Sequence, residues 1–186
     1  MLILASGSPR RRSLLAQVGI PYMVNPSSYK EDAPARKDPE KFVIAQALGK
    51  AKDVASRYPD QWVLGADTVV VFDGEILGKP KNEKDAISML KGLSNHKHSV
   101  FTGLALVKDD TVYTKAVETK VWFRKLKERE IVEYVCSGEP MDKAGSYGIQ
   151  GKAAIFIDKI NGSYTNVVGL PVSQVYTMLQ KAKVME

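Results

Sequence analysis

Short apolar runs alternate with helical patterns along this chain, which is typical of an α/β fold. Apolar or alternating runs predict strands at residues 2–5, 62–64, 68–72, 99–107, 112–124 and 153–160. Apolar residues at helical spacing predict helices that begin near Pro9, Asp38, Asn82, Lys127 and Pro171. No internal repeat or linker interrupts this pattern, so we expect one domain over residues 1–186.

The stretch from Leu64 to Pro80 is the centre of the pattern. We expect the strand at 62–64 to break at Gly65, a second β-branched run to follow at 68–72, and Asp73-Gly74 to form a hairpin turn. Asp67 lies between the two apolar runs, where a charged side chain is costly unless it opens into a cleft or meets cations. Two hypotheses fit this position: a carboxylate that satisfies backbone donors at a bend, or a functional carboxylate.

A basic segment joins the first strand to the first predicted helix. Ser8 is a suitable N-cap, Pro9 fits the first helical position, and Gly19 provides a helix stop. Arginines in the first turn oppose the helix dipole, which favours anions at this end. We therefore favour a phosphate site formed by Arg10-Arg11-Arg12 and free backbone N–H groups over a solvated basic turn.

Two more polar segments carry candidate residues. Residues 20–39 form a proline-containing irregular connection, typical of an active-site loop, whose Glu31 and Asp32 are either metal ligands or solvated. Lys50 and Lys52 flank the apolar stripe of the helix that follows. Residues 139–152 form a glycine-rich loop, but its spacing does not match a Walker phosphate loop and a strand is predicted after it.

Composition narrows the class of partner. The chain has 27 Lys and Arg against 21 Asp and Glu, a formal net charge of +6, which favours anionic ligands. The basic residues form no long stripe with interleaved aromatics, which argues against nucleic acid as the main partner. No apolar run has membrane-spanning length and no signal-peptide pattern is found at the N-terminus, so we expect no membrane association and a cytoplasmic location.

Cysteine and histidine exclude some chemistries. The single cysteine, Cys136, rules out a disulfide framework and a cysteine-based zinc site, and its helical pattern predicts a core residue. His96 and His98 are the only histidines and are predicted to lie in a polar turn, which argues against a Ser-His-Asp triad.

The polar segments at 6–12, 65–68, 78–81 and 142–151 each follow or interrupt an apolar strand. In an open α/β sheet such segments gather at strand ends and line one cleft. The gathered set would surround the Asp67 carboxylate with the cations of Arg10, Arg11, Lys79 and Lys143. This arrangement suits a polyphosphate, because cations neutralise its charge while the carboxylate binds Mg²⁺ or orients a water.

Ordered motifs in this chain resemble those of the septum-formation inhibitor Maf family. They are Ser6-Gly7-Ser8-Pro9-Arg10-Arg11, Gly65-Ala66-Asp67-Thr68, Gly78-Lys79-Pro80, Met141-Asp142-Lys143-Ala144-Gly145, Tyr147-Gly148-Ile149-Gln150-Gly151, Asn161-Gly162-Ser163-Tyr164 and Gly169-Leu170-Pro171. The resemblance runs from Leu4 to about Leu179. It implies an elongated, mixed β-sheet flanked by helices with a central cleft, as in the related inosine-triphosphate pyrophosphatases.

The resemblance also implies an activity. The family's members are nucleoside triphosphate pyrophosphatases with a house-cleaning role; they are usually homodimers and need a divalent cation such as Mg²⁺, Mn²⁺ or Co²⁺. Carried over by motif, Asp67 would accept the proton of the attacking water and, with Glu31, would hold the metal. Base selection would fall to Arg10, Thr68 and Gln150, and phosphate binding to Ser8, Arg11, Lys50 and Lys79. Arg11 and Lys79 are expected to face solvent in the cleft.

Three motifs separate the family's subgroups. In this chain the three motifs are Arg10 after Pro9, Ala66-Asp67-Thr68 and Ile149-Gln150-Gly151. They resemble the subgroup that hydrolyses dTTP and UTP, with modified pyrimidine nucleotides as further candidate substrates, and not the subgroup that acts on 7-methyl-GTP. A hypothesis from another class is a non-enzymatic regulator of septation that binds a protein or DNA. We favour the enzyme, because a binding protein gives no reason for a carboxylate inside a cationic cleft.

Overall fold

The computed structural model describes residues 1–33 and 38–185. Its elements are, in chain order, β1 (Leu2–Leu4), α1 (Pro9–Gln17), β2 (Tyr22–Val24), α2 (Pro39–Ala55), β3 (Trp62–Phe72), β4 (Glu75–Leu77), α3 (Glu83–Leu93), β5 (Lys97–Lys108), β6 (Thr111–Phe123), α4 (Glu128–Cys136), the 3₁₀ turns η1 (Glu139–Asp142), η2 (Ala144–Ser146) and η3 (Lys152–Phe156), β7 (Ile157–Asn161), α5 (Tyr164–Val168) and α6 (Val172–Lys181). Within the described ranges, none of the helices is long and apolar enough to span a membrane.

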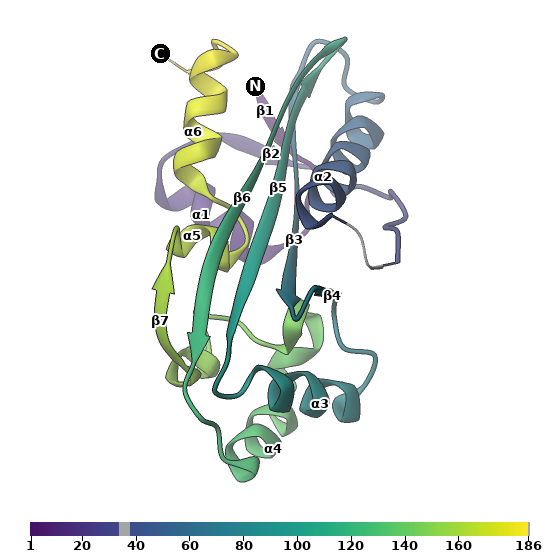
Figure 1. Cartoon of the computed structure of the whole chain (residues 1–186). Helices are drawn as coiled ribbons and strands as arrows, with labels where there is room; N and C mark the ends of the chain where they lie inside the picture. The colour runs from purple at the N-terminus through teal and green to yellow at the C-terminus, as the bar shows by residue number, and fades with distance from the viewer. Residues whose placement is uncertain (34–37, 186) are drawn as a thin grey trace.

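One mixed sheet runs through the molecule. In the described part of the chain it has seven strands in the order β2-β1-β3-β5-β6-β7, with β4 paired to β3. β1 lies parallel to β2 and β3, and the remaining pairs are antiparallel. Because β3, β5 and β6 are long, the sheet is elongated (Figure 1). This architecture confirms the predicted elongated, mixed α/β fold.

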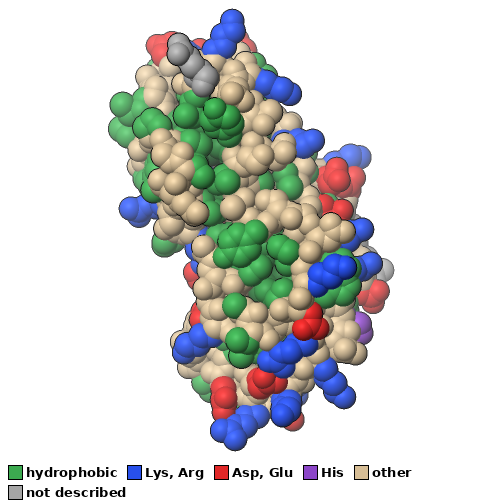
Figure 2. Space-filling model, turned by 90° about the vertical axis from the view of Figure 1, so that its left-hand side faces the viewer, with side chains coloured by type: hydrophobic (Ala, Val, Ile, Leu, Met, Phe, Trp, Pro, Cys, Tyr) green, Lys and Arg blue, Asp and Glu red, His purple; other side chains and the backbone are tan. Residues whose placement is uncertain are grey.

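Two groups of helices cover the two ends of the long strands (Figure 1). At one end α2 covers one face of the sheet and α1, α5 and α6 cover the other. Strand alternation produces this arrangement, because Leu2 and Leu4 pack with α1 and α6 while Ile3 packs against α2. At the other end α3 and α4 enclose a separate core around Leu90 and Phe123. Figure 2 shows the same elongated outline from the side of α6, with charged side chains concentrated toward the end that carries α4.

One edge of β3 is left unpaired between β1 and β4. The pairing with β1 ends at Leu4 opposite Leu64, and the pairing with β4 begins at Val70 opposite Leu77. Within the described ranges, residues 65–69 therefore have a strand neighbour only on the β5 side. Side chains alternate along a strand, so Asp67 is directed toward α2 and Thr68 toward α1 and α5. Two polar side chains are thus presented on opposite faces at one open edge.

The central stretch forms a single strand, so the predicted break at Gly65 is wrong. Gly65 lies inside β3, and a Cβ atom there would come within 2.2 Å of the carbonyl oxygen of Ala47 on α2. Gly103 on β5 is in the same situation against Val43. The glycine is therefore needed for close packing of a helix and does not end the strand. The Asp73-Gly74 turn is confirmed, with positive φ at both residues as a type I′ hairpin requires.

Three other predictions need correction. The run predicted as a strand at 153–160 begins as the 3₁₀ turn η3, and β7 starts at Ile157. The connection at 20–39 contains the edge strand β2, and its residues 34–37 lie outside the described residues. Cys136 is exposed on α4, because the buried face of this helix is formed by Ile131, Tyr134 and Val135.

His98 is also placed differently from the prediction. It lies on β5 and is only 3% exposed, packed against the rings of Phe123 and Tyr147. Its Nε2 is 2.7 Å from the Tyr147 hydroxyl oxygen. Burial lowers the pKa of His98 to about 4. The ring is therefore neutral at neutral pH and belongs to the core beside the cleft.

Candidate active site

A cleft of about 810 Å³ opens at the unpaired edge of β3. Its walls come from the loop after β1, the loop before α2, the middle of β3, the β4–α3 connection and residues 142–150. All nine site residues predicted from the sequence line it: Ser8, Arg10, Arg11, Glu31, Lys50, Asp67, Thr68, Lys79 and Gln150. The polar segments expected to gather at strand ends therefore meet in one cleft.

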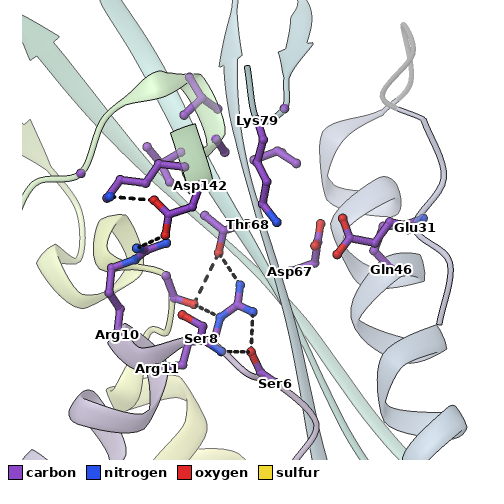
Figure 3. Close-up of a pocket in the computed structure, with 18 of the residues that line it drawn as sticks. Ser6, Ser8, Arg10, Arg11, Glu31, Gln46, Asp67, Thr68, Lys79 and Asp142 are labelled. Atoms are coloured by element: carbon purple, nitrogen blue, oxygen red, sulfur yellow. Dashed lines mark hydrogen bonds and ion pairs between the residues drawn. The ribbon is translucent and has the colours of Figure 1, made fainter. Parts of the chain in front are cut away.

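Two carboxylates converge on one ammonium group at the centre of the cleft. Lys50 Nζ on α2 lies 2.7 Å from Asp67 Oδ1 on β3 and 2.7 Å from Glu31 Oε1 in the loop before α2. The side chains of Lys50 and Asp67 are 11% and 10% exposed, whereas that of Glu31 is 50% exposed. Figure 3 shows Lys79 reaching toward Asp67 from the opposite wall. The cleft thus holds a largely buried ion pair that a third charged group joins.

The cations around Glu31 change its acidity. Partial burial by itself raises the pKa of Glu31, but the hydrogen bond and charge of Lys50 outweigh it, with further help from Lys79 and Arg11. The net pKa of Glu31 is below its ordinary value. Glu31 is therefore an anion at neutral pH and is available as an oxygen ligand.

The carboxylate pair fits a divalent cation that is shared with a ligand. Oxygens of Glu31 and Asp67 both lie 2.7 Å from Lys50 Nζ, so the two carboxylates come near each other around one positive charge. Among the described residues, no group of three or more His, Cys, Asp or Glu side chains could hold a metal ion. Mg²⁺ is usually bound by one or two carboxylates, with water and substrate phosphates completing the shell. The donor set fits this arrangement and not a closed protein-only site.

Arg11 is held inside the protein on the other side of β3. Its Nε donates to the carbonyl oxygen of Gly169 at 2.8 Å, and its Nη1 and Nη2 donate to Ser6 Oγ at 3.2 Å and Thr68 Oγ1 at 3.1 Å (Figure 3). Burial lowers the pKa of Arg11, against the opposing charge of Asp67, yet a guanidinium stays charged at neutral pH. Arg11 therefore lines the cleft as expected, but it is partly buried and bound to the protein instead of being free in solvent. Three of its five N–H donors are used in the protein, which fixes the orientation of the other two.

Arg10 connects the basic segment to the far rim of the cleft. Its Nη1 lies 3.3 Å from Asp142 Oδ2, and Lys143 Nζ lies 2.8 Å from the other oxygen of the same carboxylate. Burial raises the pKa of Asp142, but these two cations, with Lys143 first, bring it below its ordinary value. Lys143 also donates to the carbonyl oxygen of Glu139. Lys143, expected among the cations around Asp67, is thus paired with Asp142 at the rim.

The other predicted residues differ in how tightly they are held. The Thr68 hydroxyl lies 2.9 Å from Thr102 Oγ1 and accepts from Arg11, so it is tied into the protein. Ser8 precedes α1 as predicted, but its side chain makes no capping bond to the helix. Gln150 is exposed on the cleft wall and Lys79 is exposed as expected. These last two side chains are the ones best placed to reach a ligand.

Two site residues escaped the sequence analysis. Gln46 is 1% exposed on α2, where its amide holds Asp32 of the neighbouring loop. A polar residue four positions before Lys50, on the same helix face, was the available signal. Asp142 belongs to the motif at residues 141–145, but its pairing with Arg10 spans 132 residues and has no local signal.

The fold and the cleft define a class of protein: a mixed α/β protein whose cationic cleft encloses two converging carboxylates, suited to a polyanion together with a cation. The family model for Maf-like proteins matches residues 1–182. This chain belongs to the Maf family, as its motifs predicted.

Relatives with high identity carry one name. A protein from Symbiobacterium thermophilum is 52% identical over 178 residues, which cover 96% of this chain and 92% of the relative. A protein from Dictyoglomus turgidum is 48% identical over 183 residues, covering 97% and 95%. Both are named dTTP/UTP pyrophosphatase.

Solved structures confirm the architecture. A HAM1 protein from Coxiella burnetii superimposes with a TM-score of 0.55 at 14% identity, covering 97% of this chain and 98% of that one. The Ham1 protein of Staphylococcus aureus gives a TM-score of 0.53 at 13% identity, with the same coverage. At such low identity the likeness concerns the fold alone.

Proposed function

We propose that this protein is a nucleoside triphosphate pyrophosphatase that hydrolyses dTTP and UTP to the monophosphate and pyrophosphate. The observation that carries the proposal is the convergence of Asp67 and Glu31 on Lys50 Nζ inside a cleft that Arg10 and Lys79 also line. The names of the relatives at about half identity supply the pyrimidine substrates. A regulator that only binds a partner does not account for a largely buried carboxylate in such a cleft.

Asp67 is proposed as the proton acceptor. The water oxygen forms a bond to the α-phosphorus, the bond from that phosphorus to the bridging oxygen of the β-phosphate breaks, and pyrophosphate leaves. Asp67 takes the proton that the water loses, and Lys50 orients the carboxylate through its contact with Oδ1. When bound, a divalent cation held by Glu31 and Asp67 neutralises phosphate charge; Mg²⁺ is proposed, with Mn²⁺ and Co²⁺ as substitutes.

The cations of the cleft are proposed to hold the phosphates. Arg11 offers two oriented N–H donors from a guanidinium that is already fixed by the protein. Lys79 brings an exposed ammonium from the opposite wall. The Ser8 hydroxyl lies at the start of α1 and makes no capping bond to the helix. Lys50 stabilises negative charge beside Asp67. Charge that grows on the leaving pyrophosphate is stabilised best by donors that are already in place.

Base selection is proposed for the wall that carries Gln150, with Arg10 and Thr68 contributing. The pairing edge of thymine and uracil presents a carbonyl, an N–H group and a second carbonyl. An amide such as Gln150 both donates and accepts, so it can pair with that edge. In cytosine an amino donor replaces the first carbonyl and an unprotonated ring nitrogen replaces the N–H group, so two of the three positions are reversed. Modified pyrimidines that keep this edge belong to the proposed substrate range, and 7-methyl-GTP does not.

We further propose that residues 1–186 form a single domain and that the protein is a cytoplasmic house-cleaning enzyme that acts as a homodimer. Light scattering of the purified protein checks the oligomeric state. A role in septation is a second function to test only if hydrolysis is absent.

The decisive experiment compares Asp67→Asn with the wild type in pyrophosphate release from dTTP with Mg²⁺. Asparagine keeps the shape and removes the base, so we expect turnover to fall by at least ~10²-fold. A panel of dTTP, UTP, CTP and 7-methyl-GTP measures the base preference under the same conditions. Near-normal turnover in the variant would show that Asp67 is structural, and faster cleavage of 7-methyl-GTP than of dTTP would overturn the pyrimidine assignment.

A further inference from the structure

Residues 27–32 of the loop before α2 run along one face of that helix. The helix residues that meet this segment are Gln46, Gly49, Lys50 and Asp53, whose spacing of three or four residues places them on one stripe. Glu31, the more exposed of the two converging carboxylates, lies within this loop. Its position therefore depends on what fixes the loop to the helix.

One end of the loop is held by Asp53. Its Oδ2 accepts from Ser27 Oγ at 2.8 Å and from the Ser28 backbone N–H at 2.8 Å. The Ser27 hydroxyl, followed by the Ser28 backbone, lowers the pKa of Asp53. A carboxylate that accepts several hydrogen bonds from one short segment fixes both its backbone and its side chains.

The other end is held by Gln46, which is almost completely buried. Its Oε1 accepts from the Asp32 backbone N–H at 2.9 Å, and its Nε2 donates to Asp32 Oδ2 at 3.0 Å. The two bonds use both ends of the amide, so they define the position of the residue that follows Glu31. A buried amide is tolerated only with such partners.

Between these two ends the loop packs onto Gly49. A Cβ atom at this position would lie 2.4 Å from atoms of the Tyr29 ring. Glycine inside a helix costs roughly 1 kcal/mol relative to alanine, so its presence here has a packing reason. The missing side chain lets the ring of Tyr29 lie directly on the helix backbone, two residues from Glu31.

We propose that Gln46, Gly49 and Asp53 are positioning residues that hold the loop against α2, so that the Glu31 carboxylate meets Lys50 beside Asp67. This inference rests on the proposed function, in which Glu31 helps to hold the divalent cation. None of the three touches the reacting atoms. Their effect on the reaction passes through the place and the mobility of Glu31.

The test compares Gly49→Ala with the matched control Gly92→Ala. Gly92 also lies in a helix, α3, and a Cβ atom there would have its nearest neighbour at 3.9 Å, an ordinary contact. The first measurement is amide hydrogen exchange at Ser28 and Asp32, because both N–H groups donate to side chains on α2. We expect exchange to be faster by roughly ten-fold or more in Gly49→Ala and unchanged in Gly92→Ala.

The second measurement is binding of Mn²⁺ alone, followed by electron paramagnetic resonance. We expect Gly49→Ala to weaken Mn²⁺ binding several-fold, on the order of the 10–100-fold effects of outer residues at metal sites, and Gly92→Ala to leave it unchanged. In turnover the variant should need more metal for half-maximal rate while keeping most of its rate at saturating metal. Gln46→Leu, which removes both bonds to Asp32, should act in the same direction.

Unchanged exchange at Ser28 and Asp32 in both Gly49→Ala and Gln46→Leu would overturn the inference. Faster exchange with unaltered Mn²⁺ binding would also overturn it, since the loop would then move without affecting the carboxylate pair. Failure of the proposed function looks different: the wild-type protein would release no pyrophosphate from any nucleoside triphosphate, whatever the exchange rates are.

Discussion

Lys50→Met tests the ion-pair centre of the cleft. Methionine keeps much of the length of the side chain and removes its charge, leaving Asp67 and Glu31 without the ammonium that both contact at 2.7 Å. Removing one partner of a fully buried ion pair costs ~3–5 kcal/mol of unfolding free energy. Here Glu31 is half exposed and the pair borders an open cleft, so water can solvate part of the released charge. We expect a loss of about 2–3 kcal/mol in metal-free buffer.

Urea unfolding of the single and double variants measures this value. In Asp67→Asn the nearby charge is already removed, so adding Lys50→Met should cost less, with a coupling energy of ~1–3 kcal/mol between the two sites. Mg²⁺ should stabilise Lys50→Met more than the wild type, because the ion can meet two carboxylates that no longer have a cation. Lys52→Met is the matched control, since Lys52 is exposed on the same helix, and its effect should stay within ~0.5 kcal/mol.

A variant Lys50→Met that is as stable as Lys52→Met and responds to Mg²⁺ like the wild type would refute this reasoning. It would mean that the three charged groups are solvated separately in solution and do not act as one unit.

Three further predictions address other parts of the cleft. Arg11→Ala removes three hydrogen bonds of a partly buried guanidinium and should lower the unfolding free energy by about 2–4 kcal/mol. Lys79→Ala changes an exposed side chain, so it should leave stability unchanged and lower kcat/KM by an amount that corresponds to ~1–3 kcal/mol. Denaturation and steady-state kinetics with dTTP separate the two effects, and equal stabilities of the two variants would contradict the structure. Gln150→Glu replaces a donor by an acceptor on an exposed side chain, so dTTP turnover should fall by roughly ten-fold or more with no change in melting temperature; a loss shared equally by CTP would argue against base pairing by this residue. The pKa of His98 is about 4 in the folded state against an ordinary value of 6.5, so between pH 6.5 and pH 4 the unfolded state binds more protons than the folded state. The free energy of unfolding should therefore fall by up to about 3 kcal/mol as the pH drops from 6.5 to 4. In urea titrations, His98→Phe should flatten this pH dependence and His96→Gln should keep it.

Much of the site could be predicted because its residues stand in short, ordered motifs. The turn at Asp73-Gly74 and the start of α1 at Pro9 depend on local backbone chemistry, and both were placed correctly. The cationic cleft around Asp67 also follows from where polar segments meet apolar strands. The turn and the helix start need only neighbouring residues to define them, whereas the cleft also needs the rule that polar segments gather at strand ends.

The features that could not be predicted depend on partners far away in the chain. From the sequence Gly65 predicts a strand break, because the close packing of α2 against it is not visible there. Arg11 likewise reads as a free cation, because its hydrogen-bond partner Gly169 lies 158 residues later in the chain. His98 follows the same rule, since its burial is due to Phe123 and Tyr147. Cys136 was predicted in the core for a different reason. On a short helix such as α4, a shift of one position along the sequence moves a side chain from the buried face to the exposed face, and the apolar pattern does not resolve such a shift.

The close packing of α2 on Gly65 and Gly103 has a consequence for mutational tolerance. Gly103 is directly opposite Asp67 in the β3–β5 register, and Gly65 precedes Asp67 by two residues on the same strand. A methyl group at either position would come within 2.2 Å of a backbone oxygen of α2, so the helix would have to move away from the sheet and carry Lys50 with it. Neither glycine is among the residues that line the cleft. In a library selected for activity, we expect these two positions to be as restricted as Asp67, the proposed proton acceptor. The absence of two side chains sets the distance across which Lys50 reaches Asp67.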